Sequence, residues 1–121
     1  MNLSPIIKTT IIAVIIAKPV LTVKKLKKFI LVGNMIELGK YSKKLHLKIA
    51  NYINRSNINK TFVYGKLTKH TFNKLKPQIR GRILNNKIDI LNLINKELPN
   101  NSFLMVKGSN STGLNKIIKN L

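Results

Sequence analysis

The chain contains no cysteine, so disulfide bonds and thiolate metal sites are excluded. Acidic residues are almost as scarce, with three aspartates and glutamates against 23 lysines and arginines. Histidine occurs only at His46 and His70. Because carboxylates and imidazoles are the other common ligands of protein-bound metals, the chain is a poor candidate for a metalloenzyme.

Long apolar runs are also missing. Between Lys8 and Lys18 the apolar segment of residues 9–17 has about half of the roughly 20 residues that a membrane-spanning helix needs. A signal peptide is the weaker alternative, because Lys18-Pro19 is a poor cleavage site. Ser4-Pro5 instead resembles a helix start, so we expect a buried helix here and no membrane span.

The scarcity of acids leaves a net charge of +20, which attracts polyanions such as nucleic acid or anionic lipid. Arginine, the usual reader of base edges, occurs only at Arg55, Arg80 and Arg82. The lysines are spread along every segment, and Ile and Asn, which AT-rich codons also encode, are abundant beside them. Non-specific binding of polyanions is expected, whereas a dedicated nucleic-acid site is the weaker alternative.

What the chain does have is enough apolar sequence for a core, with 44% hydrophobic residues in 121. Buried strands are predicted over 27–33, 59–65, 82–84 and 102–108. Helices are predicted from Ser42, its expected cap, through Ile53, and over 67–76, 89–98 and 114–121. The alternation predicts one α/β domain over residues 1–121, Rossmann-like, with a mostly parallel sheet and helices on both faces.

Ligands of such sheets bind beyond the carboxyl ends of the strands. This rule selects three turns, namely Gly33-Asn34, Tyr64-Gly65 and Lys107-Gly108-Ser109. The last turn has a lysine and backbone N–H groups suited to an anion, although an ordinary strand-to-helix connection has the same composition. It lacks the spacing of a Walker A loop.

The sequence pattern alone leaves the roles of three titratable residues undecided. Glu37 is either a solvated loop residue or a carboxylate that orients a cationic group, and a lone carboxylate is a weak catalytic signature. His46 and His70 both fall on expected helices. For each we favour a surface or half-buried structural role over ligand binding.

The motifs resemble those of a known family. GNMIELG at residues 33–39, followed by Tyr41-Ser42 and Leu45-His46, is similar to the GDMLELG…S..LH signature of the C-terminal domain of the Mur ligases. The VYG element at 63–65 and VKGS at 106–109 follow in the family's order. NLSP at 2–5 is similar to the element that opens the domain, so the resemblance spans essentially the whole chain.

The resemblance implies one domain of a three-domain cytoplasmic enzyme of peptidoglycan synthesis. The member concerned joins D-alanyl-D-alanine to UDP-N-acetylmuramoyl-tripeptide, and uses ATP and magnesium to form an acyl phosphate. By resemblance, Asn2 and Pro5 would lie by the nucleotide. The substrate cleft would be bordered by Gly33, Asn34, Glu37, Gly39, Lys107, Gly108 and Ser109. No catalytic residue or metal ligand is expected in this chain.

Several departures from the family pattern affect function. Asn34 replaces an aspartate, and Asn110 stands where an arginine is usual. The sequence contains no P-loop, so the N-terminal and central domains would have to be supplied as partners. The isolated chain is therefore expected to bind no cofactor and to be inactive. A truncated ligase, a split ligase, a small basic nucleic-acid-binding protein and a membrane-associated protein remain the alternatives.

Overall fold

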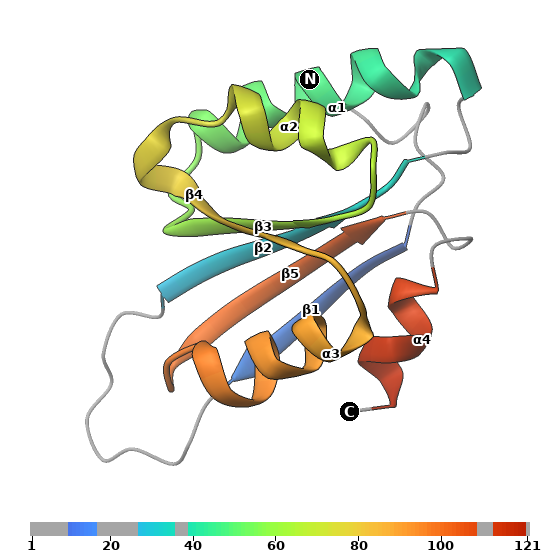
Figure 1. The fold of residues 1–121 in the computed structure, drawn as a ribbon. Coiled ribbons are helices and arrows are strands. Elements are labelled where there is room, and N and C mark those ends of the chain that lie inside the picture. Colours follow the sequence, from blue (N-terminus) through green and yellow to red (C-terminus); the bar gives the residue numbers. More distant parts are fainter. Residues whose placement is uncertain (1–9, 17–26, 36–38, 109–112, 121) are drawn as a thin grey trace.

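The computed structural model describes residues 10–16, 27–35, 39–108 and 113–120. Its centre is a five-stranded sheet in the order β1-β5-β2-β3-β4 (Figure 1). The strands are β1 (Thr10–Ile16), β2 (Lys27–Gly33), β3 (Lys60–Tyr64), β4 (Arg80–Leu84) and β5 (Ser102–Gly108). Strands β2 to β5 are parallel, and β1 pairs antiparallel with β5. The expected mostly parallel sheet is confirmed.

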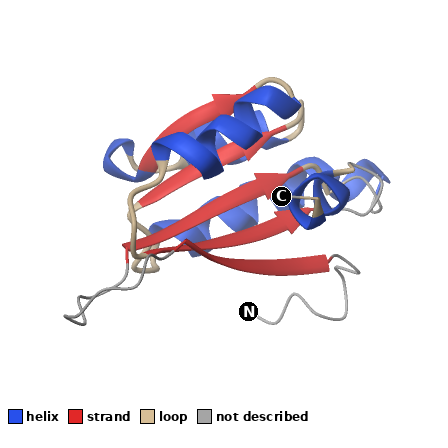
Figure 2. Ribbon diagram, turned by 90° about the horizontal axis from the view of Figure 1, so that it is seen from below, coloured by secondary structure: helices blue, strands red, loops and turns tan. Residues whose placement is uncertain are grey.

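Helices cover both faces of this sheet. Helices α1 (Ser42–Asn54) and α2 (Thr68–Lys74) lie on one face, and α3 (Lys87–Asn92) and α4 (Leu114–Lys119) lie on the other (Figure 1). Figure 2, seen from the side of α3 and α4, shows the strands running side by side beneath them. Short turns complete the described chain, namely η1 (Gly39–Tyr41), η2 (Pro77–Ile79) and the π-helical η3 (Leu93–Glu97). The expected Rossmann-like layering is thus observed.

The core is divided by the sheet into two apolar clusters. In β2, Phe29 and Leu31 pack on the α3/α4 side, while Ile30 and Val32 pack on the α1/α2 side. Successive side chains of a strand point to opposite faces, so both faces are buried only if every residue is apolar. The unbroken run FILV in β2 is therefore explained by its central place in the sheet.

The expectation of a buried helix at the N-terminal apolar segment is wrong over residues 10–16. This segment forms β1, which pairs along its whole length with β5, from Thr10 opposite Gly108 to Ile16 opposite Ser102. A short apolar run is compatible with helix or strand, but TIIAVII is rich in β-branched residues that favour a strand. Pairing with β1 also covers the edge that β5 would otherwise expose. The proposed helix start at Ser4-Pro5 lies outside the described residues.

Two helix boundaries also differ from expectation. Helix α3 begins at Lys87, ahead of the expected start at Asp89, because the side chain of Asn86 accepts a hydrogen bond from the Asp89 N–H (2.8 Å) and caps the helix. Strand β4 begins at Arg80 and includes the expected segment from Arg82.

Ser42 is not the cap of α1. Tyr41 occupies the N-cap position with no side-chain cap, and Ser42 is the first helical residue. The Ser42 side chain is buried, and its Oγ has no hydrogen-bond partner among the residues that the structure describes. A buried hydroxyl without a partner is destabilising.

Replacement of Ser42 by alanine should therefore increase the free energy of unfolding, by about 1 kcal/mol, because it removes the unpaired hydroxyl. If Ser42 were the helix cap, the same replacement would instead lower the free energy of unfolding by about 1 kcal/mol. Urea unfolding of the wild type and Ser42→Ala separates the two. Asn86→Ala, which removes a true cap, serves as the control and should be destabilising.

Candidate functional site

The carboxyl ends of β2, β3, β4 and β5 meet at one edge of the sheet, because these strands are parallel. From β2 the chain passes through α1 to β3 and through α2 to β4, moving steadily to one side. It then returns through α3 to place β5 on the other side of β2. The connections diverge between β2 and β5, and such a switch point is where open α/β sheets bind ligands.

Two glycines allow β2 and β5 to approach closely at this switch point. A Cβ added to Gly108 would lie 3.2 Å from the Cα of Gly33, and one added to Gly33 would lie 3.0 Å from Cδ2 of Leu114. The first of these neighbours is backbone and has no freedom to rotate away. Gly33 and Gly108 therefore let the two strand ends and the start of α4 pack together.

Asn34 connects the turn after β2 to the turn after β3. Its Oδ1 accepts a hydrogen bond from the Leu67 N–H (3.0 Å), and its amide lies against Gly65. Gly65 has a φ of +119°, a conformation that side-chain-bearing residues rarely adopt. A carboxylate oxygen can accept the same hydrogen bond, so the change from the family's aspartate keeps this contact and removes the charge.

His46 fixes the next residue of the same turn. The Met35 N–H donates to Nε2 of His46 (3.0 Å), and Nδ1 lies 3.1 Å from Oγ1 of Thr71. The Thr71 hydroxyl donates in turn to the backbone carbonyl of His46 (2.8 Å). Because Nε2 is an acceptor, the neutral ring has its proton on Nδ1 and donates it to Thr71.

The environment of His46 keeps the ring neutral. The side chain is fully buried in the layer between α1 and the sheet. Burial first, and the charge of His70 second, lower the pKa of His46 to about 4. The expected structural role is therefore observed, although His46 is more deeply buried than expected and Thr71 was not anticipated. The helical spacing of His46, Ala50 and Ile53 was the available signal, because it places all three on the buried side of α1.

Lys107 is the one lysine among the candidate residues. It lies next to last in β5, opposite Val32 of β2 and Ile11 of β1. Its side chain is half-buried, and burial lowers the pKa of its ammonium group. The switch point thus has a cation beside a tightly packed pair of glycines.

Of the residues named from the sequence, the structure brings Gly33, Asn34, Lys107 and Gly108 to the strand ends. Gly39 begins the η1 turn that leads into α1. Four others, Asn2, Pro5, Glu37 and Ser109, lie outside the described residues, as does Asn110. His70 is half-buried on α2.

The chemistry of the described edge is that of binding and positioning. Asp89 lies beyond β4, but its carboxylate accepts from the Asn85 N–H (2.9 Å) at the start of α3. In the part of the chain that the structure describes, no three histidine, aspartate or glutamate side chains come close enough to hold a metal ion. These residues do not fit a magnesium site, and we assign no step to one.

Two of the three arginines have intramolecular partners. Arg80 donates to the carbonyls of Phe72 (3.1 Å) and Asn73 (2.8 Å) at the end of α2. Arg82 forms an ion pair with Glu97, including an Nε–Oε1 contact of 3.2 Å. These contacts occupy the groups that would read base edges, which weakens the case for a sequence-specific nucleic-acid protein.

Comparison with known proteins points to one enzyme. The UDP-N-acetylmuramoyl-tripeptide–D-alanyl-D-alanine ligase of Buchnera aphidicola subsp. Baizongia pistaciae is 34% identical over 96 residues, which are 78% of this chain and 20% of that ligase. The same ligase of Rickettsia prowazekii is 28% identical over 88 residues, 73% of this chain and 20% of that protein. The chain is homologous to this ligase, MurF. It spans about one fifth of the length of these relatives.

Solved structures of MurF share the fold. MurF of Thermotoga maritima, crystallised with ADP, superposes with a TM-score of 0.62 at 18% identity over 78% of this chain and 21% of that one. A structure of MurF from Acinetobacter baumannii gives 0.62 at 20% identity over 81% and 22%. No family model matches the sequence. None of the helices described is both long and apolar enough to cross a bilayer.

Proposed function

We propose that the chain is the C-terminal, amine-presenting domain of a ligase that adds D-alanyl-D-alanine to UDP-N-acetylmuramoyl-tripeptide in peptidoglycan synthesis. The observation that carries the proposal is the homology to MurF over 78% of the chain at 34% identity. The matched part is 20% of that relative. ATP binding and activation of the tripeptide carboxylate therefore belong, in this proposal, to the other domains, whether fused to this chain or encoded separately.

The geometry of the strand ends supports a positioning role. The contacts of Asn34 with Gly65 and Leu67, and of His46 with Met35, hold the turns after β2 and β3 in one arrangement. The paired glycines and Lys107 form a compact rim at the switch point. A rigid rim of this kind contributes to rate by holding the incoming amine in line with the activated carboxylate when the domains close.

A chimaera tests the proposal. We expect that this chain, placed in the Buchnera ligase instead of the matching 96 residues, supports ligation of D-alanyl-D-alanine when ATP and magnesium are supplied. The isolated chain should show no turnover with the same substrates. Product formation is measured by mass spectrometry of the UDP-linked pentapeptide.

Gly108→Val in the chimaera is the matched variant. A side chain at this position displaces the end of β2, and we expect a fall in kcat of roughly 100-fold, the effect of a small misplacement of the reacting groups. Lys96→Gln, an exposed position remote from the rim, should leave kcat unchanged. A chimaera that folds, as judged by circular dichroism, but forms no product would contradict the proposal, as would turnover by the isolated chain.

A further inference from the structure

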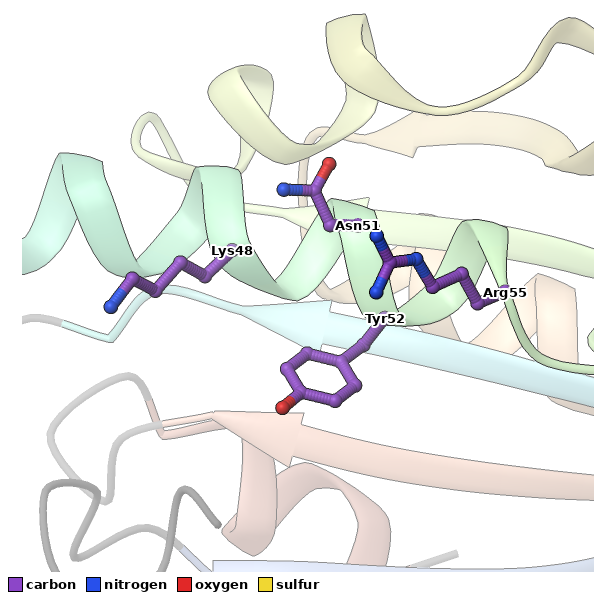
Figure 3. Close-up of a pocket in the computed structure, with 4 residues that line it drawn as sticks. All are labelled: Lys48, Asn51, Tyr52 and Arg55. Carbon is purple, nitrogen blue, oxygen red and sulfur yellow. The ribbon is translucent and has the colours of Figure 1, made fainter. Parts of the chain in front are cut away.

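The second half of α1 has a feature that the ligase proposal does not use. Lys48, Asn51, Tyr52 and Arg55 follow at spacings of three, one and three residues, which place them on one side of the helix. They line a pocket of about 310 Å³ that opens to solvent. Figure 3 shows the Arg55 guanidinium turned back along the helix toward Asn51, while Lys48 extends toward the start of α1 and Tyr52 points down toward the sheet.

The positive charge of this pocket is not neutralised by any described residue. Segment 42–54 contains three lysines and no acid, and Arg55 follows it directly. The two acids that the structure describes, Asp89 and Glu97, lie with α3 on the opposite face of the sheet (Figure 1). The Asp89 carboxylate accepts a hydrogen bond from the Asn85 N–H, and Glu97 pairs with Arg82. Lys48 and Arg55, two turns apart on α1, therefore give this side of the helix a positive charge that no described acid offsets, and such a surface attracts an anion.

Tyr52, which lies between the two cations in the sequence, adds an aromatic surface to the pocket. Its ring is half-buried, whereas Lys48, Asn51 and Arg55 are exposed. A partly buried tyrosine has few conformations to lose, so its ring offers a face for stacking at little entropic cost. Arginine and lysine bind phosphate oxygens, and the Asn51 amide can both donate and accept hydrogen bonds.

We propose that this α1 pocket, defined by Lys48, Asn51, Tyr52 and Arg55, binds a nucleoside phosphate. The phosphate lies between Lys48 and Arg55, and the base stacks on Tyr52. The volume of about 310 Å³ is at the lower end of the range for small-molecule sites, which suits a single nucleotide unit. The pocket is built by the helix side and not by the strand ends, so the proposal is independent of the proposed ligase role.

The nucleotide unit has two possible sources, a free mononucleotide or one unit of a single-stranded nucleic acid. Both present a phosphate next to a planar ring, and stacking with cationic flanks is the usual way in which proteins hold single strands. The net charge of +20 raises the encounter rate with either source but supplies no pocket. The test therefore compares adenosine monophosphate with a short oligodeoxyadenylate.

The experiment is a titration of the ¹⁵N-labelled 121-residue chain, followed by amide chemical shifts. Adenosine monophosphate should shift the amides of residues 48–55 most, and ribose 5-phosphate should shift them with lower affinity because it lacks the base. Tighter binding of the oligonucleotide at the same amides identifies a nucleic acid as the source, and equal binding per nucleotide identifies the free nucleotide. Either result supports nucleotide binding at the α1 pocket.

Variants distinguish binding in the α1 pocket from non-specific attraction by the net positive charge. Lys48→Gln with Arg55→Gln should weaken binding of adenosine monophosphate roughly tenfold or more, because both phosphate contacts are lost. The control pair, Lys87→Gln with Lys96→Gln, removes the same charge from exposed positions on the α3 side and should have little effect. Tyr52→Leu should weaken adenosine monophosphate roughly fivefold or more and leave ribose 5-phosphate unchanged.

Three results would overturn the proposal. The first is equal weakening by the two charge pairs, which indicates non-specific attraction. The second is the absence of shifts in residues 48–55 at millimolar adenosine monophosphate. The third is a Tyr52→Leu variant that binds like the wild type while its melting temperature is unchanged, since folding would then be intact and the ring without a role.

Discussion

Lowering the pH from 7 to 4 should reduce the free energy of unfolding by about 3 kcal/mol through His46 alone. The folded chain holds the pKa of this histidine at about 4, below its ordinary value of 6.5. Between pH 4 and pH 6.5, His46 is mostly protonated in the unfolded chain and mostly neutral in the folded chain. The contribution of His46 to stability is therefore present above pH 6.5, falls as the pH drops toward 4, and levels off below the folded-state pKa.

Urea unfolding at a series of pH values measures this dependence. Only three acids occur in the whole chain, so few carboxylates titrate in the same window. His46→Leu should remove most of the slope, at the cost of lower stability at pH 7, because the Met35 N–H loses its acceptor.

His70→Gln is the control for the pH series. It leaves the contacts of His46 with Met35 and Thr71 intact, and it removes only the lesser cause of the lowered pKa. Most of the slope should therefore persist in this variant. A flat profile in the wild type, or an unchanged slope in His46→Leu, would contradict the assignment.

Gly65→Ala should be the most damaging single methyl addition at the strand ends, with a loss of about 3 kcal/mol. Two costs add at this position. The φ of +119° is one that alanine rarely adopts, and the new Cβ would overlap the Asn34 amide, which is held in place by the Leu67 N–H. Thermal or urea unfolding gives the magnitude.

Gly113 supplies the matched comparison. It also has a positive φ, +73°, but a Cβ there meets nothing within 4 Å. Gly113→Ala should therefore show the conformational cost alone, about 1 kcal/mol. In an Asn34→Ala background, Gly65→Ala should cost less than in the wild type, because the overlap is gone. Equal losses at the two glycines would show that the contact with Asn34 is unimportant.

Resemblance and pattern together anticipated much of the strand-end site. The glycine turns after β2, β3 and β5 were expected at a common edge, and the parallel pairing of these strands confirms this. The role of Asn34 could not be foreseen, since Leu67, its partner, is 33 residues away along the chain. The contact of His46 with Thr71 joins residues 25 apart, and no local pattern encodes such a pair.

The sequence by itself determined most of the alternation of strands and helices. A strand that is buried on both faces needs an unbroken run of apolar residues, whereas a helix that is buried on one side needs a stripe of apolar residues along that side. FILV of β2 and the Leu45, Ile49 and Ile53 stripe of α1 are examples. Only the tertiary structure decided the state of residues 10–16, since the period of a short apolar run such as TIIAVII does not separate strand from helix, and its β-branched residues give only a preference until β5 offers an edge to pair with. The tertiary structure likewise decided that His46 is neutral, because the shift of its pKa from the ordinary value of 6.5 comes from the water that neighbouring elements exclude and from the charge of His70.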